Sequence, residues 1–244
     1  MKPQYLGDSK DCFKWDYLHF LVQELGYRQL QIAWMMTRDD NGPEGGTPPE
    51  CFPVPEPAKQ KIWNFCHCLK KNHDPKLLVK LAATTAARYT VSLYKPDEPL
   101  VNKKRGTYFS DLVYGPDQVL FLDPDNGFEP ERSCTAKHVR YDEVEGILKR
   151  VSPASVVTVF QHNRRKKFPE DLARIRKRLC RHYCAAIYWR SLMFVTISTS
   201  KETIRRVREA NCKYAKDRPP VKVLDQDPHQ AVPSRYNIKS ERGK

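Results

Sequence analysis

The chain has 244 residues, of which 43 are Lys or Arg and 29 are Asp or Glu, so its formal charge is +14. Forty per cent of the residues are hydrophobic, which is enough for a packed core and excludes a chain that is disordered throughout. The mean hydropathy is −0.69, no apolar run approaches the roughly 18 residues of a membrane span, and the first residues lack the apolar core of a secretory signal, so we expect a cytoplasmic protein without membrane contact.

The first half of the chain alternates helix and strand patterns. A helix is predicted from Asp8 to Gly26, because apolar side chains recur there at helical spacing and glycine can end a helix. The pattern then predicts a buried strand over residues 30–36 and a Pro- and Gly-rich surface loop over about 41–57. Two helices follow, one over residues 58–71 and one from Pro75 onward, and then a strand over residues 88–94.

The second half is more regular and ends in an antiparallel pair. It predicts a strand over residues 118–122, a helix over 141–151, a strand over 155–160 and a basic helix over 169–182. Two paired strands over residues 185–189 and 193–197 follow, and then a second basic helix over 201–216. We therefore predict one α/β domain over residues 1–218, built on an open, mostly parallel sheet that closes with an antiparallel hairpin. Residues 219–244 are rich in Pro, Gln and charge and are predicted to form a basic, flexible tail.

Polar side chains follow three of the predicted strands. Because ligands of open α/β sheets bind outside the carboxyl ends of the strands, we expect these side chains to line one crevice. A plain β-turn explains the Asp-Pro-Asp-Asn-Gly segment equally simply, and a strand-end histidine often only hydrogen-bonds to the backbone. The candidate catalytic residues are Asp123, Asp125, Asn126, His162, Asp39 and Asp40.

The excess of positive charge is concentrated on the two predicted basic helices and at the start of the first helix. Such clusters favour a polyanionic partner, and we expect double-stranded DNA held through its phosphates; a solvated basic surface without a partner is the alternative. The candidate nucleic-acid-binding residues are Lys14, Arg164, Arg165, Lys166, Lys167, Arg174, Arg178, Arg205 and Arg208.

Eight cysteines are present, and we expect no disulfides in a cytoplasmic protein of this size. Two clusters resemble metal ligands in spacing, Cys66-His67-Cys68 and Cys180-x-His182-x-Cys184, but neither has the paired C-x-x-C form of a zinc module. Both fall in segments with helical patterns, where cysteine is commonly a small buried apolar residue. We therefore expect no metal site.

Three motifs together resemble a widespread family of uncharacterised bacterial and prophage proteins: Gly7-Asp8-x-x-Asp11-x-x-Lys14, Leu122-Asp123-Pro124-Asp125-Asn126-Gly127 and His162-x-Arg164. More distantly, the order of elements over residues 5–216 is similar to that of Rossmann-like rRNA adenine-N6 methyltransferases. This second resemblance implies a Rossmann-like, methyltransferase-like sheet and S-adenosylmethionine as cofactor. Two departures stand out: residues 37–41 replace a Gly-rich cofactor turn, and Asn126 replaces the tyrosine that stacks on the target adenine.

A crevice lined by acids beside basic helices, without a cofactor loop, predicts a cofactor-independent hydrolase acting on DNA. We expect a DNA glycosylase that excises a normal or modified base rotated out of the duplex, and the prophage setting of the resembling family suggests antiviral defence. Asp123 or Asp125 would support the water or the sugar, Asn126 would read the base, and His162 would stabilise the leaving group. The alternatives are an S-adenosylmethionine-dependent adenine-N6 methyltransferase, a metal-dependent nuclease using Asp39, Asp123 and Asp125, and a nucleic-acid-binding module without catalysis.

Overall fold

A seven-stranded sheet forms the centre of the molecule in the computed structural model, which describes residues 3–37, 46–163 and 167–224. The strand order is β2-β1-β3-β6-β8-β7-β9. The first four strands in this order are parallel, whereas β8 is antiparallel to both its neighbours and β9 is antiparallel to β7. The strands are β1 (Gln29–Ala33), β2 (Thr90–Tyr94), β3 (Gln118–Leu122), β6 (Val156–His162), β7 (Tyr183–Trp189), β8 (Leu192–Ser198) and β9 (Lys222–Val223).

The predicted α/β fold is confirmed by this sheet, which has a parallel core and antiparallel C-terminal strands and is consistent with a Rossmann-like fold. The central strands β3, β6 and β8 are buried on both sides, as expected for a sheet with helices on both faces. A separate two-stranded sheet is formed by β4 (Gly127–Phe128) and β5 (His138–Val139), directly after the Asp-Pro-Asp-Asn segment.

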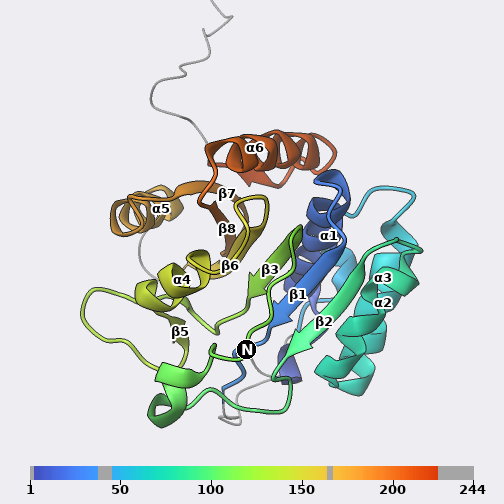
Figure 1. Cartoon of the computed structure of the whole chain (residues 1–244). Coiled ribbons are helices and arrows are strands. Elements are labelled where there is room, and N and C mark those ends of the chain that lie inside the picture. Colours follow the sequence, from blue (N-terminus) through green and yellow to red (C-terminus); the bar gives the residue numbers. More distant parts are fainter. Residues whose placement is uncertain (1–2, 38–45, 164–166, 225–244) are drawn as a thin grey trace, which may run out of the picture.

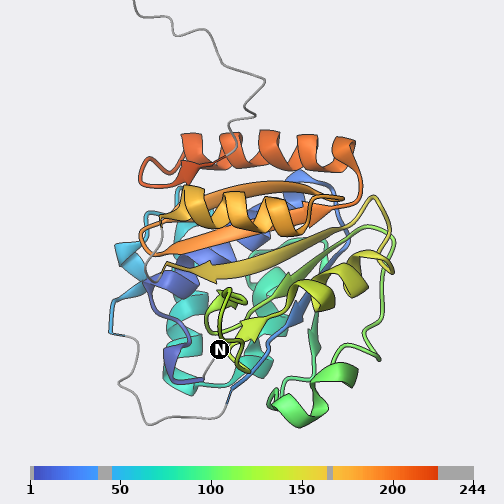
Figure 2. The same ribbon diagram turned by 90° about the vertical axis from the view of Figure 1, so that its left-hand side faces the viewer.

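Helices cover the two faces of the sheet unequally (Figures 1 and 2). On one face, α1 (Ser9–Glu24), α2 (Lys59–Asn72), α3 (Leu81–Thr84) and α6 (Lys201–Lys216) share an apolar core with side chains such as Phe121 and Phe194. On the other face, α4 (Tyr141–Leu148) and α5 (Phe168–Arg178) pack on Leu120 and Val195. The two basic helices, α5 and α6, therefore lie on opposite faces.

Local sequence signals fix the start of α1. The Asp8 carboxylate caps the helix by accepting hydrogen bonds from the backbone N–H groups of Lys10, at 2.8 Å, and Asp11, at 2.9 Å. Gly7 precedes the cap with φ of +79°, and a Cβ there would lie 2.1 Å from the Cys66 carbonyl oxygen of α2. Only glycine therefore allows α1 and α2 to approach so closely at this point.

The structure differs from the sequence prediction in several places. The strand predicted over residues 30–36 ends at Ala33, and the helix predicted over residues 141–151 ends at Leu148. The helix predicted from Pro75 is a 3-10 segment, η3 (Pro75–Lys80), followed by the single turn α3. The helix predicted over residues 169–182 ends at Arg178. Residues 219–224 were predicted to lie in the tail, but they include β9, which pairs with Ile187 and Tyr188 at the edge of the sheet.

The described part of the predicted Pro- and Gly-rich loop, residues 46–57, contains the short 3-10 segment η2 (Pro49–Cys51) and buries Phe52 and Val54. Two more 3-10 segments, η1 (Pro3–Tyr5) and η4 (Asn102–Thr107), complete the described helical elements. None of the helices in the described ranges is long and apolar enough to cross a membrane.

Candidate functional site

Three strand ends bring the candidate residues together at one edge of the sheet. Asp123 and Asp125 follow β3, Thr37 lies four residues beyond β1, and His162 ends β6. The Asp123 backbone N–H donates to the Ala33 carbonyl at 3.0 Å, which continues the β1–β3 pairing into the site. The predicted crevice residues that the structure describes are therefore neighbours. Asp39 and Asp40, also predicted for this crevice, lie outside the described residues.

A buried cluster of charge links α1 to the end of β3. The ammonium group of Lys14 lies 2.9 Å from Asp123 Oδ2 and 3.0 Å from Asp11 Oδ1, and all three side chains are almost fully buried. The rings of Trp15 and Phe160 each have their centroids 5.2 Å from the same ammonium group. Lys14 was predicted to contact nucleic acid, but the structure encloses its charge in the interior and pairs it with carboxylates.

The protonation of this cluster follows from its composition. Burial alone would lower the pKa of Lys14, but the two adjacent carboxylates raise it above its ordinary value, so the ammonium group stays charged. Burial raises the pKa of Asp123, and the charge of Lys14 offsets only part of that effect. Because one cation is shared between two carboxyl groups, the pKa of Asp123 stays above its ordinary value. Its contacts are those of a group that positions the loop.

Asp125, two residues further on, has a different environment. It is half-buried, and Oδ2 accepts a hydrogen bond of 2.5 Å from the Thr37 hydroxyl. Burial raises the pKa of Asp125, but neighbouring positive charge and the Thr37 hydrogen bond outweigh this effect, so the pKa lies below its ordinary value. Asp125 is therefore an ionised carboxylate at neutral pH.

The loop that carries Asp125 is held in place by Gln161, the penultimate residue of β6. Gln161 Oε1 accepts a hydrogen bond of 2.8 Å from the Phe128 N–H, and Nε2 lies 3.5 Å from Asp171 Oδ2 on α5. Gly127 has φ of +94°, and a Cβ there would lie 2.2 Å from Gln161 Oε1. The sequence analysis missed Gln161; the signal was a buried polar residue at the end of an apolar strand.

The third strand end places His162 beside the β7–β8 turn. His162 Nδ1 lies 2.9 Å from the Asn163 carbonyl oxygen, and because a carbonyl only accepts, Nδ1 carries a proton in this contact. The Asn163 N–H donates to the Ser191 carbonyl at 2.8 Å, which fixes the hairpin tip next to the site. Arg190 is exposed on this tip with its guanidinium 4.5 Å from the Trp189 ring centroid, and the sequence analysis did not single it out.

Asn126, the predicted base reader, is half-buried in the same loop. Its backbone N–H donates to the Lys137 carbonyl at 2.9 Å, which helps to close the segment between β4 and β5. The carboxyl end of the sheet therefore carries an ionised carboxylate and an amide-bearing residue on the loop after β3, and an imidazole at the end of β6.

Several basic residues that were predicted to bind nucleic acid contact groups of the protein itself. Arg174 donates to the Glu129 carbonyl at 2.7 Å and to the Tyr141 hydroxyl at 3.0 Å, so it supports the loop after β4. Arg205 forms ion pairs with Glu202 and Glu209 on its own helix. Arg164, Arg165 and Lys166 lie outside the described residues, and Lys167 is exposed at the start of α5.

Arg208 lies toward the end of the sheet opposite the strand ends that carry Asp125. Arg178 ends α5, with its guanidinium 5.2 Å from the Tyr141 ring centroid, and Arg208 Nη2 lies 3.4 Å from the Cys184 carbonyl oxygen. Cys184 is paired with Ile197, which is level with Val157 at the start of β6. Arg208 is therefore separated from the strand ends that carry Asp125, whereas the guanidinium of Arg178 lies over Tyr141, whose ring stacks on Phe128 just after that loop.

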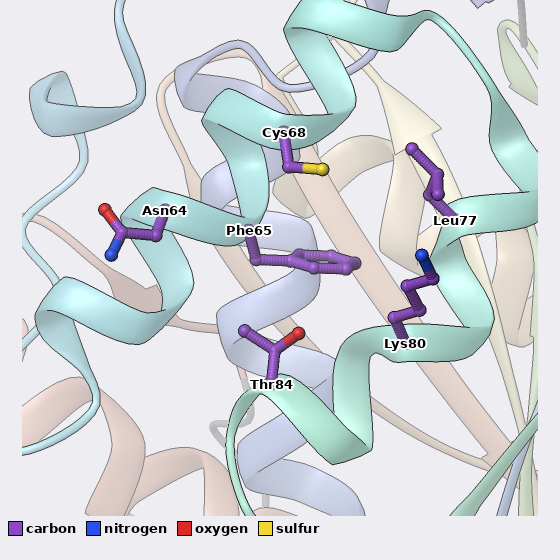
Figure 3. A pocket seen from close by; sticks show the side chains of 6 residues that line it. All are labelled: Asn64, Phe65, Cys68, Leu77, Lys80 and Thr84. Atoms are coloured by element: carbon purple, nitrogen blue, oxygen red, sulfur yellow. The ribbon is translucent and has the colours of Figure 1, made fainter.

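A pocket of about 120 Å³ lies between α2 and the η3–α3 segment (Figure 3). Side chains of α2 and of the η3–α3 segment face each other across it; they are Asn64, Phe65, Cys68, Leu77, Lys80 and Thr84. None of the candidate catalytic residues lines this pocket.

Among the described residues, no group of three or more His, Cys, Asp or Glu side chains is arranged to hold a metal ion. All eight cysteines are free thiols, and Cys66 and Cys184 are buried in the core. No protein-family model matches this chain, and no curated protein matches it either.

Proposed function

We propose that the protein is a hydrolase that acts on DNA and releases a base, with Asp125 as its essential carboxylate. One observation carries the proposal: at the carboxyl end of the parallel sheet, Asp125 is half-buried and accepts a hydrogen bond from Thr37, while Asp123 of the same loop is buried against Lys14. Ligands of such sheets bind at this end, and a carboxylate held there can stabilise positive charge that develops on a sugar. The partner class follows from the formal charge of +14.

In the proposed reaction, the bond between the sugar C1′ and the base nitrogen breaks with its electron pair leaving on the base. The ionised Asp125 stabilises the positive charge that develops on the sugar and orients a water molecule, whose oxygen bonds to C1′. A proton from that water balances the charge on the departing base. Lys14 and Asp123 act through the loop, because they hold Asp125 without facing the crevice themselves.

Two further residues complete the proposed site. With a proton on Nδ1, neutral His162 presents Nε2 as an acceptor, and protonated His162 presents Nε2 as a donor to the leaving base. Asn126 supplies an amide with both donor and acceptor groups, which is the chemistry that reads a base edge.

The test is incubation of the full-length protein with duplexes containing normal and modified bases, followed by mass spectrometry of the products. We expect a free base from at least one substrate, and we expect Asp125→Asn to reduce the rate of release at least 100-fold. Asp117→Asn is the matched control, because Asp117 is exposed just before β3, at the end remote from the site, and this variant should keep the wild-type rate. A cut strand that requires added Mg²⁺, or wild-type activity of Asp125→Asn, would contradict the proposal.

A nucleic-acid methyltransferase is the second candidate, and one observation favours it. The antiparallel β8 lies between the parallel strands β6 and β7, as in the closing hairpin of the methyltransferases that the sequence resembles. Against it, the segment after β1 begins with the buried bulky residues Trp34 and Met35, where that family needs glycine. Calorimetry with S-adenosylmethionine separates the candidates: micromolar binding and a mass gain of one methyl group would favour the methyltransferase.

A further inference from the structure

We propose that the sheet edge at the start of β7 is a second binding surface, which holds single-stranded DNA away from the crevice. This β7 edge surface consists of Arg176, Lys177, Arg178, Arg181, Tyr183 and Arg208. The inference that its partner is DNA rests on the proposed function. The surface adds a second binding site, which takes no part in the proposed reaction.

The first support is the way two helices from opposite faces of the sheet converge there. Arg176 of α5 and Arg208 of α6 place their Nη2 atoms 3.5 Å and 3.4 Å from one acceptor, the Cys184 carbonyl oxygen. β9 pairs with Ile187 and Tyr188, and the Leu224 N–H donates to the Ala186 carbonyl at 3.0 Å; the Cys184 carbonyl lies two residues before Ala186 on β7. The two basic helices thus meet at the edge of the sheet, although they do not share a face.

The second support is the local charge. Between Leu172 and Tyr183 the sequence contains five Arg or Lys residues and no Asp or Glu. Lys177, Arg178 and Arg181 are exposed. The pKa of His182 is lowered, first by burial and further by the charges of Arg181 and Lys149, with Glu145 acting in the opposite direction. The potential around the start of β7 is therefore positive, and phosphate is the complementary ligand.

The third support is an exposed aromatic side chain at the start of β7, next to Cys184. Tyr183 is 40% exposed, and it is one of three large hydrophobic side chains that are exposed in the described part of the chain. An aromatic ring among arginines is the arrangement by which proteins bind single strands, because bases stack on the ring while cations follow the backbone. Charged residues also protect sheet edges from pairing with other chains, but that role alone would require neither the exposed ring nor the additional cations on α5.

Distance separates this surface from the site. β7 and β6 run in the same direction, so Tyr183 lies at the end of the sheet opposite His162. Seven-residue strands at about 3.3 Å per residue put roughly 20 Å between the two ends. A strand bound at the β7 edge surface is thus held without occupying the crevice.

The experiment measures binding of the full-length protein to fluorescent single-stranded and duplex oligonucleotides by anisotropy over a range of salt concentrations. The test variant is the triple substitution Lys177→Glu, Arg178→Glu and Arg181→Glu. The control is Lys61→Glu, Lys71→Glu and Lys80→Glu, which changes the net charge equally at exposed positions on α2 and η3. We expect the test triple to weaken single-strand binding at least tenfold relative to the control triple, with a shallower salt dependence.

A second pair of variants tests the aromatic contact and does not depend on the triple variant folding normally. Tyr183→Ala should weaken single-strand binding at least fivefold, whereas Tyr183→Phe should bind as the wild type does, because stacking needs only the ring. Duplex binding should change little in Tyr183→Ala. Equal binding by the test and control triples, or by Tyr183→Ala and Tyr183→Phe, would overturn the inference.

The base-release assay distinguishes failure of this inference from failure of the proposed function. If base release is observed but the edge variants bind as their controls do, the edge surface is wrong and the chemistry stands. If no base is released from any substrate but the edge variants lose single-strand binding, the chemistry is wrong and the edge surface stands.

Discussion

Lys14 and Asp123 are 109 residues apart in the sequence, yet the ammonium group of one lies 2.9 Å from a carboxylate oxygen of the other in the interior of the fold. The contact joins the start of α1 to the loop that carries Asp125. Asp11 completes the link, since its Oδ2 accepts the Gly7 N–H at 2.9 Å while Oδ1 lies near Lys14. Two motifs that stand far apart in the chain thus form one structural unit behind the candidate site.

Replacing Lys14 with methionine should destabilise the protein by about 3–5 kcal/mol, because it leaves buried carboxylates without their cation. Urea unfolding followed by circular dichroism measures this loss. The double variant Lys14→Met, Asp123→Asn should recover more than about 1 kcal/mol of the sum of the single effects, since the two side chains are in contact. Lys10→Met is the control, because Lys10 is exposed one turn earlier on α1 and should cost less than about 0.5 kcal/mol.

Gly7→Ala should destabilise the protein by about 3 kcal/mol or more, since it combines a positive φ with a collision between Cβ and the backbone of α2. Gly26→Ala provides the comparison. Gly26 has φ of +70°, but no atom lies within 4 Å of the position of its Cβ, so the strain of the backbone alone should cost about 1–2 kcal/mol. Equal losses of unfolding free energy in the two variants would show that the close approach of α1 and α2 contributes nothing.

The sequence predicted the elements of the fold well where periodicity was strong. The strand over residues 118–122 and the helix over residues 201–216 have the predicted bounds, because an apolar run and an amphipathic repeat are local signals. The prediction of an α-helix after Pro75 was wrong, because the segment forms a 3-10 helix and both helix types begin with the same residues. The edge strand β9 was missed because two residues paired at a sheet edge carry no periodic signal.

The candidate site was predictable in position but not in the roles of its residues. Strand ends in a parallel sheet meet at one edge, so the neighbourhood of Asp123, Asp125 and His162 followed from topology. Which aspartate is buried does not follow from the sequence, because it depends on Lys14, more than one hundred residues earlier. The same holds for Arg174, whose hydrogen bonds to Glu129 and Tyr141 depend on how α5 lies over the sheet.

Gln161→Leu should disorder the loop that carries Asp125. The substitution removes the acceptor of the buried Phe128 N–H, and an unsatisfied buried donor costs about 1–3 kcal/mol. Hydrogen exchange at the Phe128 amide should become faster, as read by NMR or mass spectrometry. Thr158→Val is a matched control on the same strand: it removes a contact of 3.1 Å between Thr158 and Thr196, away from the loop, and should leave exchange at Phe128 unchanged. Unchanged exchange in Gln161→Leu would mean that other contacts hold the loop.

The stability of the fold should fall when the pH is lowered from 7.5 to about 4, and His19 should account for part of the change. Burial lowers the pKa of His19 to about 4, with further contributions from the charges of Arg218 and Lys61. Because the folded pKa lies below the unfolded value of 6.5, the neutral ring contributes stability that is fully present above pH 6.5 and is lost as the pH falls through the folded pKa. The contribution is about 3 kcal/mol at neutral pH.

The measurement for His19 is the unfolding free energy across this pH range in the wild type and in His19→Gln. Glutamine preserves a polar partner for the Tyr89 hydroxyl, which lies 3.0 Å from His19 Nδ1, but it does not titrate. Asp16 and Asp123 have pKa values raised by burial, so they stabilise the fold toward low pH and act in the opposite direction in both proteins. The difference between the two pH profiles therefore isolates His19, and it should widen in favour of the variant as the pH falls below 6.5. Parallel profiles would show that the imidazole is not buried in its neutral form.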